Sequence, residues 1–122
     1  MLPLYYATTQ GYYAGMTTSN EPGYYEDGNF GIRIENLCIT VPKQTENNFM
    51  GRRYVGFEVV TMAPIATNLI QFAQLTDVEL CWLNEYHAKV RTLLMPYMQS
   101  IFPEVVDYLI ERTQPAAAVS KM

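Results

Sequence analysis

A cluster of turn-forming residues near the start of the chain, YYEDGNFG at 24–31, most constrains how the chain can fold. Asp, Asn and Gly favour tight reversals, and Gly28 tolerates the left-handed backbone that many such turns require. The flanking segments are rich in β-branched and aromatic residues, which predicts strands near 16–20, 31–41 and 53–62. We therefore expect a β-hairpin that reverses direction at Gly28.

Two registers are open for this hairpin. A three-residue loop at 27–29 places Glu21 opposite Glu35. A two-residue Asp-Gly turn instead places Glu21 opposite Ile34. Either register brings the two carboxylates within roughly 4.5–8 Å of each other, as direct or near-diagonal neighbours.

Like charges opposed on a sheet are destabilising, so the charge of Glu21 and Glu35 needs an explanation. The expected strand around Glu35 carries apolar residues on both of its faces, which predicts that it is buried on both sides. These residues are Ile32, Ile34, Leu37, Ile39 and Val41. Buried carboxylates are rare unless they are paired or bind a metal. The plainer alternative is that both glutamates are simply solvated.

Three arrangements would accommodate the pair: one carboxyl is protonated, Arg33 neutralises both, or a cation lies between them. Arg33 and Glu35 share a face of the strand because side chains alternate with period two. A single arginine leaves one negative charge uncompensated, whereas a divalent metal balances two carboxylates. Their hard oxygen ligands suit Mn, Mg or Ca.

The second half of the chain has helical signals. Thr76 and Glu79 form a capping box, and apolar residues follow at helical spacing until Pro96, where we expect the helix to end (Val78, Trp82, Tyr86 and Leu93). A second helix is predicted from Pro103 to Gln114. His87, the only histidine, is interpreted as a helix-surface or satisfied core imidazole. Cys38 and Cys81 are interpreted as packing residues.

Composition excludes several classes of function. The net charge of −4 argues against a nucleic-acid or anionic-membrane partner. No apolar run is long enough to span a membrane, and the two cysteines form neither a disulfide framework nor a metal finger. We therefore expect a cytoplasmic protein. The last residues, Ser120-Lys121-Met122, approach a peroxisome-type address and leave that location as an alternative.

Several ordered blocks resemble the Xaa-Pro aminopeptidases (aminopeptidase P), which have the pita-bread metallopeptidase fold. The resemblance covers about 14–115 and is carried by EPGYYEDGNFGIRIEN, RRYVGFEVVTMAPI, LTDVELCWLNEYH and YLIERTQP. It implies an α+β fold: a partial pita-bread, with a curved antiparallel sheet and two C-terminal helices. We expect a Tyr-rich arm at 1–13 and a flexible tail at 116–122.

The resemblance also implies a reaction and a set of ligands. The family removes the N-terminal residue of a peptide whose second residue is proline, using two metal ions, usually Mn. Glu21 matches the glutamate that binds one metal and holds, or accepts a proton from, the attacking water. Glu35 matches the glutamate that bridges both ions, and Arg33 matches the arginine that braces the carboxylates.

The chain departs from the family pattern before Glu21. The family's two aspartates and one histidine that complete the ligand set precede this motif, and nothing here matches them. We therefore expect the C-terminal part of a catalytic domain, inactive alone and with no bound metal. The alternative is a non-catalytic oligomerisation or interaction module, because half of such a sheet leaves strand edges and an apolar face uncovered. Either reading favours a homo-oligomer.

Overall fold

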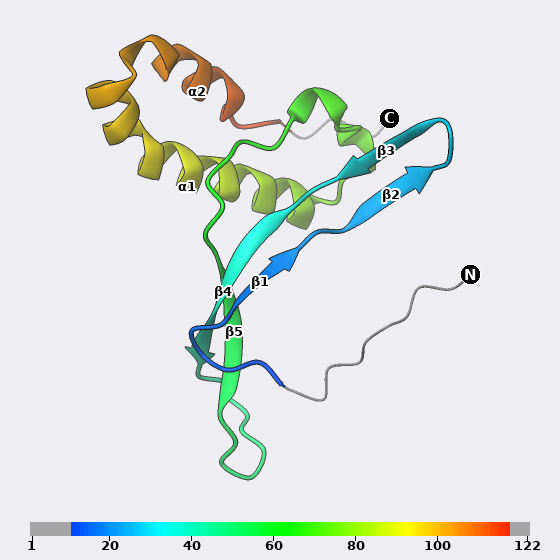
Figure 1. Cartoon of the computed structure of the whole chain (residues 1–122), viewed down its shortest axis with the longest axis vertical. Coiled ribbons are helices and arrows are strands. Elements are labelled where there is room, and N and C mark those ends of the chain that lie inside the picture. The colour runs from blue at the N-terminus through cyan, green and yellow to red at the C-terminus, as the bar shows by residue number, and fades with distance from the viewer. Residues whose placement is uncertain (1–10, 118–122) are drawn as a thin grey trace. The chain divides into compact units, whose positions relative to one another are not determined.

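The computed structural model describes residues 11–117, which form parts of two compact units divided between Thr61 and Met62 (Figure 1). The first unit is built from β-strands, and the second contains two α-helices preceded by short 3-10 turns. The chain is therefore α+β, with the helices at the C-terminal end as expected from the sequence. No helix in the described part is long and apolar enough to cross a membrane.

Within its described residues, 11–61, the first unit contains five antiparallel strands arranged in two groups. They are β1 (Thr17–Asn20), β2 (Gly23–Glu26), β3 (Phe30–Arg33), β4 (Asn36–Lys43) and β5 (Tyr54–Val59). β1, β4 and β5 form a sheet in that order, and β2 pairs with β3 in a separate ribbon. The segment 23–26, interpreted as part of the turn, is a strand. The long strand expected at 31–41 is interrupted between Arg33 and Asn36.

A single register runs through both groups of strands around the reversal. Asn20 pairs with Asn36 where β1 meets β4, and Gly23 pairs with Arg33 where β2 meets β3. Between these pairs, the Ile34 N–H donates to the Pro22 carbonyl at 3.2 Å. The structure thus has the three-residue loop at 27–29, the register that places residues 21 and 35 opposite each other.

The side chain of Glu26 holds this loop closed. The Tyr24 hydroxyl donates to Oε1 of Glu26 at 2.6 Å, and the Asn29 amide donates to Oε2 at 2.6 Å. The Asn29 N–H also donates to the Glu26 carbonyl, while Gly28 takes a φ of +70°. The Tyr24 bond, followed by the Asn29 bond, lowers the pKa of Glu26. Glu26 therefore holds this loop closed through both of its carboxylate oxygens.

The expectation that the strand around Glu35 is buried on both faces is wrong for this chain. Ile32, Ile34 and Leu37 are 43%, 44% and 52% exposed. For Ile32 the physical reason is that β3 pairs with β2 in a ribbon outside the three-stranded sheet, and every residue of β3 is exposed. Leu37 lies on the exposed face of β4. Burial is confined to alternate residues of β4, including Cys38, which confirms its interpretation as a packing residue.

In the second unit, α1 (Asp77–Ile101) begins at the predicted capping box, with the Glu79 N–H donating to Thr76 Oγ1 and the Thr76 N–H donating to Glu79. It contacts α2 (Val106–Arg112). The buried face of α1 differs from the set of apolar residues predicted from the sequence. It consists of Leu83, Tyr86, His87 and Val90. Of the predicted apolar residues, only Tyr86 is buried. Val78, Trp82 and Leu93 are at least 46% exposed.

The expectation that this helix ends at Pro96 is also wrong, because α1 continues to Ile101. Proline removes one backbone donor from a helix, at a cost of about 3 kcal/mol in a helix interior. α1 contacts α2 and the turn at Pro103–Val105, and packing of this kind can offset the loss of one backbone hydrogen bond. The second helical segment begins at Pro103, as predicted.

His87 is a buried, neutral hydrogen-bond acceptor. It is 1% exposed, and its Nε2 accepts the Ile65 N–H at 3.0 Å. The Nδ1 atom has no hydrogen-bond partner among the described residues. Burial, together with the nearby charge of Arg91, lowers the pKa of the imidazole. Of the two readings from sequence, the core imidazole is confirmed.

We predict that the free energy of unfolding falls as the pH drops below about 6.5, the ordinary pKa of histidine. In that range the unfolded chain binds more protons at this histidine than the folded chain does, and one such group contributes a slope of at most about 1.4 kcal/mol per pH unit. Denaturant titrations between pH 5 and 8 should measure this decline. In His87→Gln, which cannot titrate, the decline should be smaller; equal slopes in both proteins would contradict the assignment.

Candidate functional site

The predicted site residues lie at the interruption between the ribbon and the sheet. Glu21 follows β1, Arg33 ends β3, and Glu35 precedes β4. The interruption follows from the sequence, since Pro22 has no N–H to donate to a strand ladder. The register then brings Glu21 and Glu35 to opposite positions on neighbouring chain segments.

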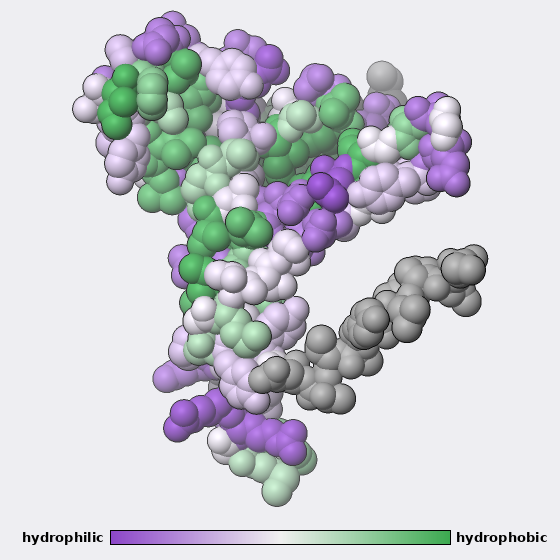
Figure 2. Space-filling model, in the orientation of Figure 1, coloured by the Kyte–Doolittle hydropathy of each residue, from purple (hydrophilic) through white to green (hydrophobic). Residues whose placement is uncertain are grey.

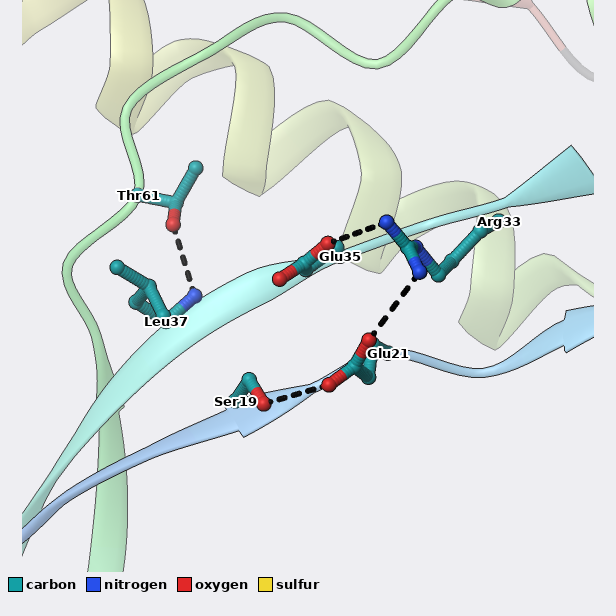
Figure 3. A network of polar contacts seen from close by, with 6 residues as sticks. All are labelled: Ser19, Glu21, Arg33, Glu35, Leu37 and Thr61. Atoms are coloured by element: carbon teal, nitrogen blue, oxygen red, sulfur yellow. Dashed lines mark hydrogen bonds and ion pairs between the residues drawn. The ribbon is translucent and has the colours of Figure 1, made fainter.

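The guanidinium of Arg33 bridges the two carboxylates, as Figure 3 shows. Its Nη1 lies 3.4 Å from Oε2 of Glu21, and its Nη2 lies 3.1 Å from Oε2 of Glu35. The structure therefore brings all three predicted residues together. Because one positive charge meets two negative ones, the cluster keeps a net charge of −1.

The cluster is half exposed. The side chains of Arg33, Glu21 and Glu35 are 49%, 46% and 41% exposed. Solvent screens such pairs strongly, so their contribution to stability is small. Of the three arrangements considered from sequence, these residues adopt the one in which arginine spans the pair.

The sequence reasoning missed two contacts in this region: one orients Glu21, and the other joins Leu37 to Thr61 nearby. The Ser19 hydroxyl donates to Oε1 of Glu21 at 2.8 Å, and leaves Oε2 facing Arg33 (Figure 3). On the other side, the Leu37 N–H donates to Oγ1 of Thr61 at 2.8 Å. The signal for Ser19 was its position two residues before Glu21, which puts both side chains on one face of an extended segment.

The donor set fits part of a site for a hard divalent cation. Two carboxylates on opposed segments supply the oxygen ligands that Mn²⁺ or Mg²⁺ prefers. However, residues 11–117 contain no group of three or more His, Cys, Asp or Glu side chains that could hold a metal ion. Additional ligands would have to come from other residues.

The remaining candidates contribute nothing to this cluster. His87 lies in the second unit and is occupied by the Ile65 N–H. Cys81 is exposed, so its interpretation as a packing residue is wrong. Its thiol lies 3.4 Å from the Glu85 carboxylate, which raises the pKa of the thiol and makes it a poor nucleophile. The Ser120-Lys121-Met122 address and the first ten residues of the Tyr-rich arm lie outside the described residues.

Sequence comparison identifies relatives over most of the chain. Residues 53–116 match the C-terminal region of peptidase M24. A probable Xaa-Pro aminopeptidase P of Coprinopsis cinerea is 48% identical over 102 residues, covering 84% of this chain and 16% of that protein. Aminopeptidase P1 of Arabidopsis thaliana is 43% identical over 104 residues, with 85% and 16% covered. The chain thus spans about 16% of the length of these relatives.

Structural comparison gives the same picture. The chain resembles an X-prolyl aminopeptidase from Caenorhabditis elegans, described as a cytosolic enzyme with a di-nuclear active site. The TM-score is 0.75 and the sequence identity 29%, and the match covers 86% of this chain and 17% of that one. The strands followed by two helices therefore correspond to one part of that enzyme.

We predict a weak but measurable coupling between Arg33 and Glu21. Arg33→Gln should lower the free energy of unfolding by about 0.2–1 kcal/mol, because the ion pairs are exposed. In a double-mutant cycle with Glu21→Gln, the two losses should not add, and the coupling should shrink in high salt. Additive effects at every salt concentration would contradict a real interaction between these side chains.

Proposed function

Because this chain belongs to the family of the C-terminal region of M24 peptidases, we propose that it supplies the two-glutamate part of a metal-dependent Xaa-Pro aminopeptidase site. The observation that carries this proposal is the convergence of Glu21 and Glu35 on one guanidinium. The reaction would release the N-terminal residue of a peptide whose second residue is proline. By analogy with the relative described as cytosolic, we place it in the cytoplasm.

The metal-binding roles below follow from the family resemblance, and the positioning roles of Arg33 and Ser19 follow from their contacts. Glu21 and Glu35 would help to hold the metal ions, and Glu21 would also hold the attacking water or accept a proton from it. Two such cations lower the pKa of a shared water and stabilise the oxyanion that develops. Arg33 keeps the two carboxylates at a fixed separation, and Ser19 fixes which oxygen of Glu21 faces the site.

The chain alone should be inactive and should bind metal weakly. Two half-exposed carboxylates that already share an arginine give a cation few ligands and little protection from water. The family resemblance implies three further ligands, two aspartates and a histidine. They would have to come from another segment, comparable to the part of the relatives that this chain does not cover. Activity would therefore require that partner segment.

A chimaera tests this proposal. The matching stretch of the Caenorhabditis elegans enzyme is replaced by residues 11–117, and cleavage of an Xaa-Pro peptide is measured with Mn. We expect activity in the chimaera and a loss of at least roughly a hundredfold in Glu35→Gln, which removes a proposed metal ligand. The matched control is Glu58→Gln, which removes the same charge from the exposed part of β5 and should change little.

The metal content of each protein tests whether Glu35 binds metal. The folded chimaera should contain two Mn per chain and Glu35→Gln fewer, while the 122-residue chain alone should contain close to none. A chimaera that folds and binds metal equally well with and without Glu35 would overturn the proposed role of this residue.

A second candidate is a non-catalytic self-association module, which the exposure of the β2–β3 ribbon favours. Large apolar and aromatic side chains project from this ribbon and are at least 43% exposed: Tyr24, Tyr25, Phe30 and Ile32. Figure 2 shows further apolar surface over α1 and α2 in the second unit. Exposed apolar patches and free strand edges are typical of surfaces that another chain covers.

We predict that the isolated chain self-associates through the ribbon. Sedimentation velocity should show a dimer or larger species, and the double substitution Tyr25→Ser/Ile32→Ser should shift it to the monomer, because both side chains are exposed. Replacing Val78 by Ser, at a position in α1 that is more exposed than either of these residues, serves as the control and should leave the distribution unchanged. A monodisperse wild-type monomer would exclude this second function.

A further inference from the structure

A pocket of about 430 Å³ lies at the end of the β4–β5 hairpin, far along the strands from the glutamate cluster. Three cationic side chains line it: Lys43 from the end of β4, and Arg52 and Arg53 from the segment that precedes β5. Neutral hydrogen-bonding side chains complete the wall, among them Asn48 and Tyr54. Figure 2 shows hydrophilic side chains gathered near this end of the hairpin.

The charge of this pocket is opposite to that of the chain. The protein has eight Lys and Arg residues and a net charge of −4, yet three of those eight line one pocket whose walls carry no acidic residue. Among residues 11–117, none of the three lies within ion-pair distance of a carboxylate. The pocket therefore gathers three positive charges that form no ion pair with a described side chain, although Glu46 lies in the same loop.

The loop that carries these cations is held by its own hydrogen bonds. The Phe49 N–H donates to the Tyr54 hydroxyl at 3.1 Å, and the Asn48 amide donates to the Arg52 carbonyl at 2.8 Å. The guanidinium of Arg52 lies 5.6 Å from the centre of the Phe49 ring. Because the Tyr54 oxygen accepts one bond here, its own O–H can still donate to a bound molecule.

A left-handed turn at the tip keeps this loop compact. Met50 and Gly51 have φ values of 54° and 66°, and the Arg52 N–H donates back to the Phe49 carbonyl at 3.2 Å. A non-glycine residue with positive φ is uncommon and persists where the surroundings hold it. The donors of the pocket are thus partly preorganised, which lowers the entropic cost of binding.

We propose that this pocket binds a small phosphate-bearing molecule. Arginine forks match phosphate oxygens in a bidentate manner, and lysine adds a point charge. Three cations exceed the charge of a carboxylate and match that of a phosphate or diphosphate group, which carries several acceptor oxygens. The neutral donors Asn48 and Tyr54 supply further hydrogen bonds. This site is independent of the proposed peptidase function.

Titration of the 122-residue chain with inorganic phosphate and pyrophosphate, at constant ionic strength, tests the proposal. Isothermal titration calorimetry and amide chemical shifts measure the binding. We expect saturable binding, tighter for pyrophosphate, with the largest shift changes at 43–54. Arg53→Gln and Lys43→Gln should each weaken pyrophosphate binding roughly tenfold, since each removes a charge-assisted hydrogen bond.

Matched controls separate a built site from general attraction of anions. Lys89→Gln and Arg112→Gln remove the same charges from the second unit and should leave the affinity unchanged. Circular dichroism verifies that each variant is folded. Non-saturable binding, shift changes spread over the whole chain, or equal losses in the pocket and control variants would overturn the proposal.

Discussion

The register of the hairpin at Gly28 is the constraint on which the glutamate site depends. Because side chains alternate between the two faces of a strand, a slip of one residue would move Glu21 away from its place opposite Glu35. The three-residue loop prevents that slip, with Glu26 binding Tyr24 and Asn29 on its two carboxylate oxygens. A structural carboxylate at the turn thus helps to determine the spacing of Glu21 and Glu35, the two carboxylates of the proposed site.

Arg33 determines the net charge of the cluster that it forms with Glu21 and Glu35. One guanidinium spans two carboxylates, so one negative charge remains uncompensated. The cluster can therefore attract a further positive charge, and its ion pairs hold it together without one. An arginine suits this task because its planar group has several fixed donors. Ser19 adds to the arrangement from the other side, since its hydroxyl occupies one oxygen of Glu21 and leaves the second for Arg33.

Local signals in the sequence predicted much of this arrangement. The turn residues around Gly28, the capping box at Thr76 and the period-two relation of Arg33 and Glu35 are all short-range patterns, and the structure contains each of them. The failures concern longer-range effects. Whether Ile32 is buried depends on which strand pairs with β3 and what lies on that ribbon, which apolar alternation does not reveal. Likewise, α1 continues beyond Pro96 and contacts α2, a partner that the local sequence pattern does not reveal.

Exposure explains why the glutamate pair needs a covering segment to become a metal site. At a surface, water screens the attraction between a cation and a carboxylate, and hydration competes for the ion. A segment that packs over the cluster would add ligands and exclude this water at the same time, so both effects would strengthen binding together. The apolar side chains of the neighbouring β2–β3 ribbon, exposed in this chain, offer that segment a surface to cover. Burial of the ribbon and assembly of the metal site would then be one event.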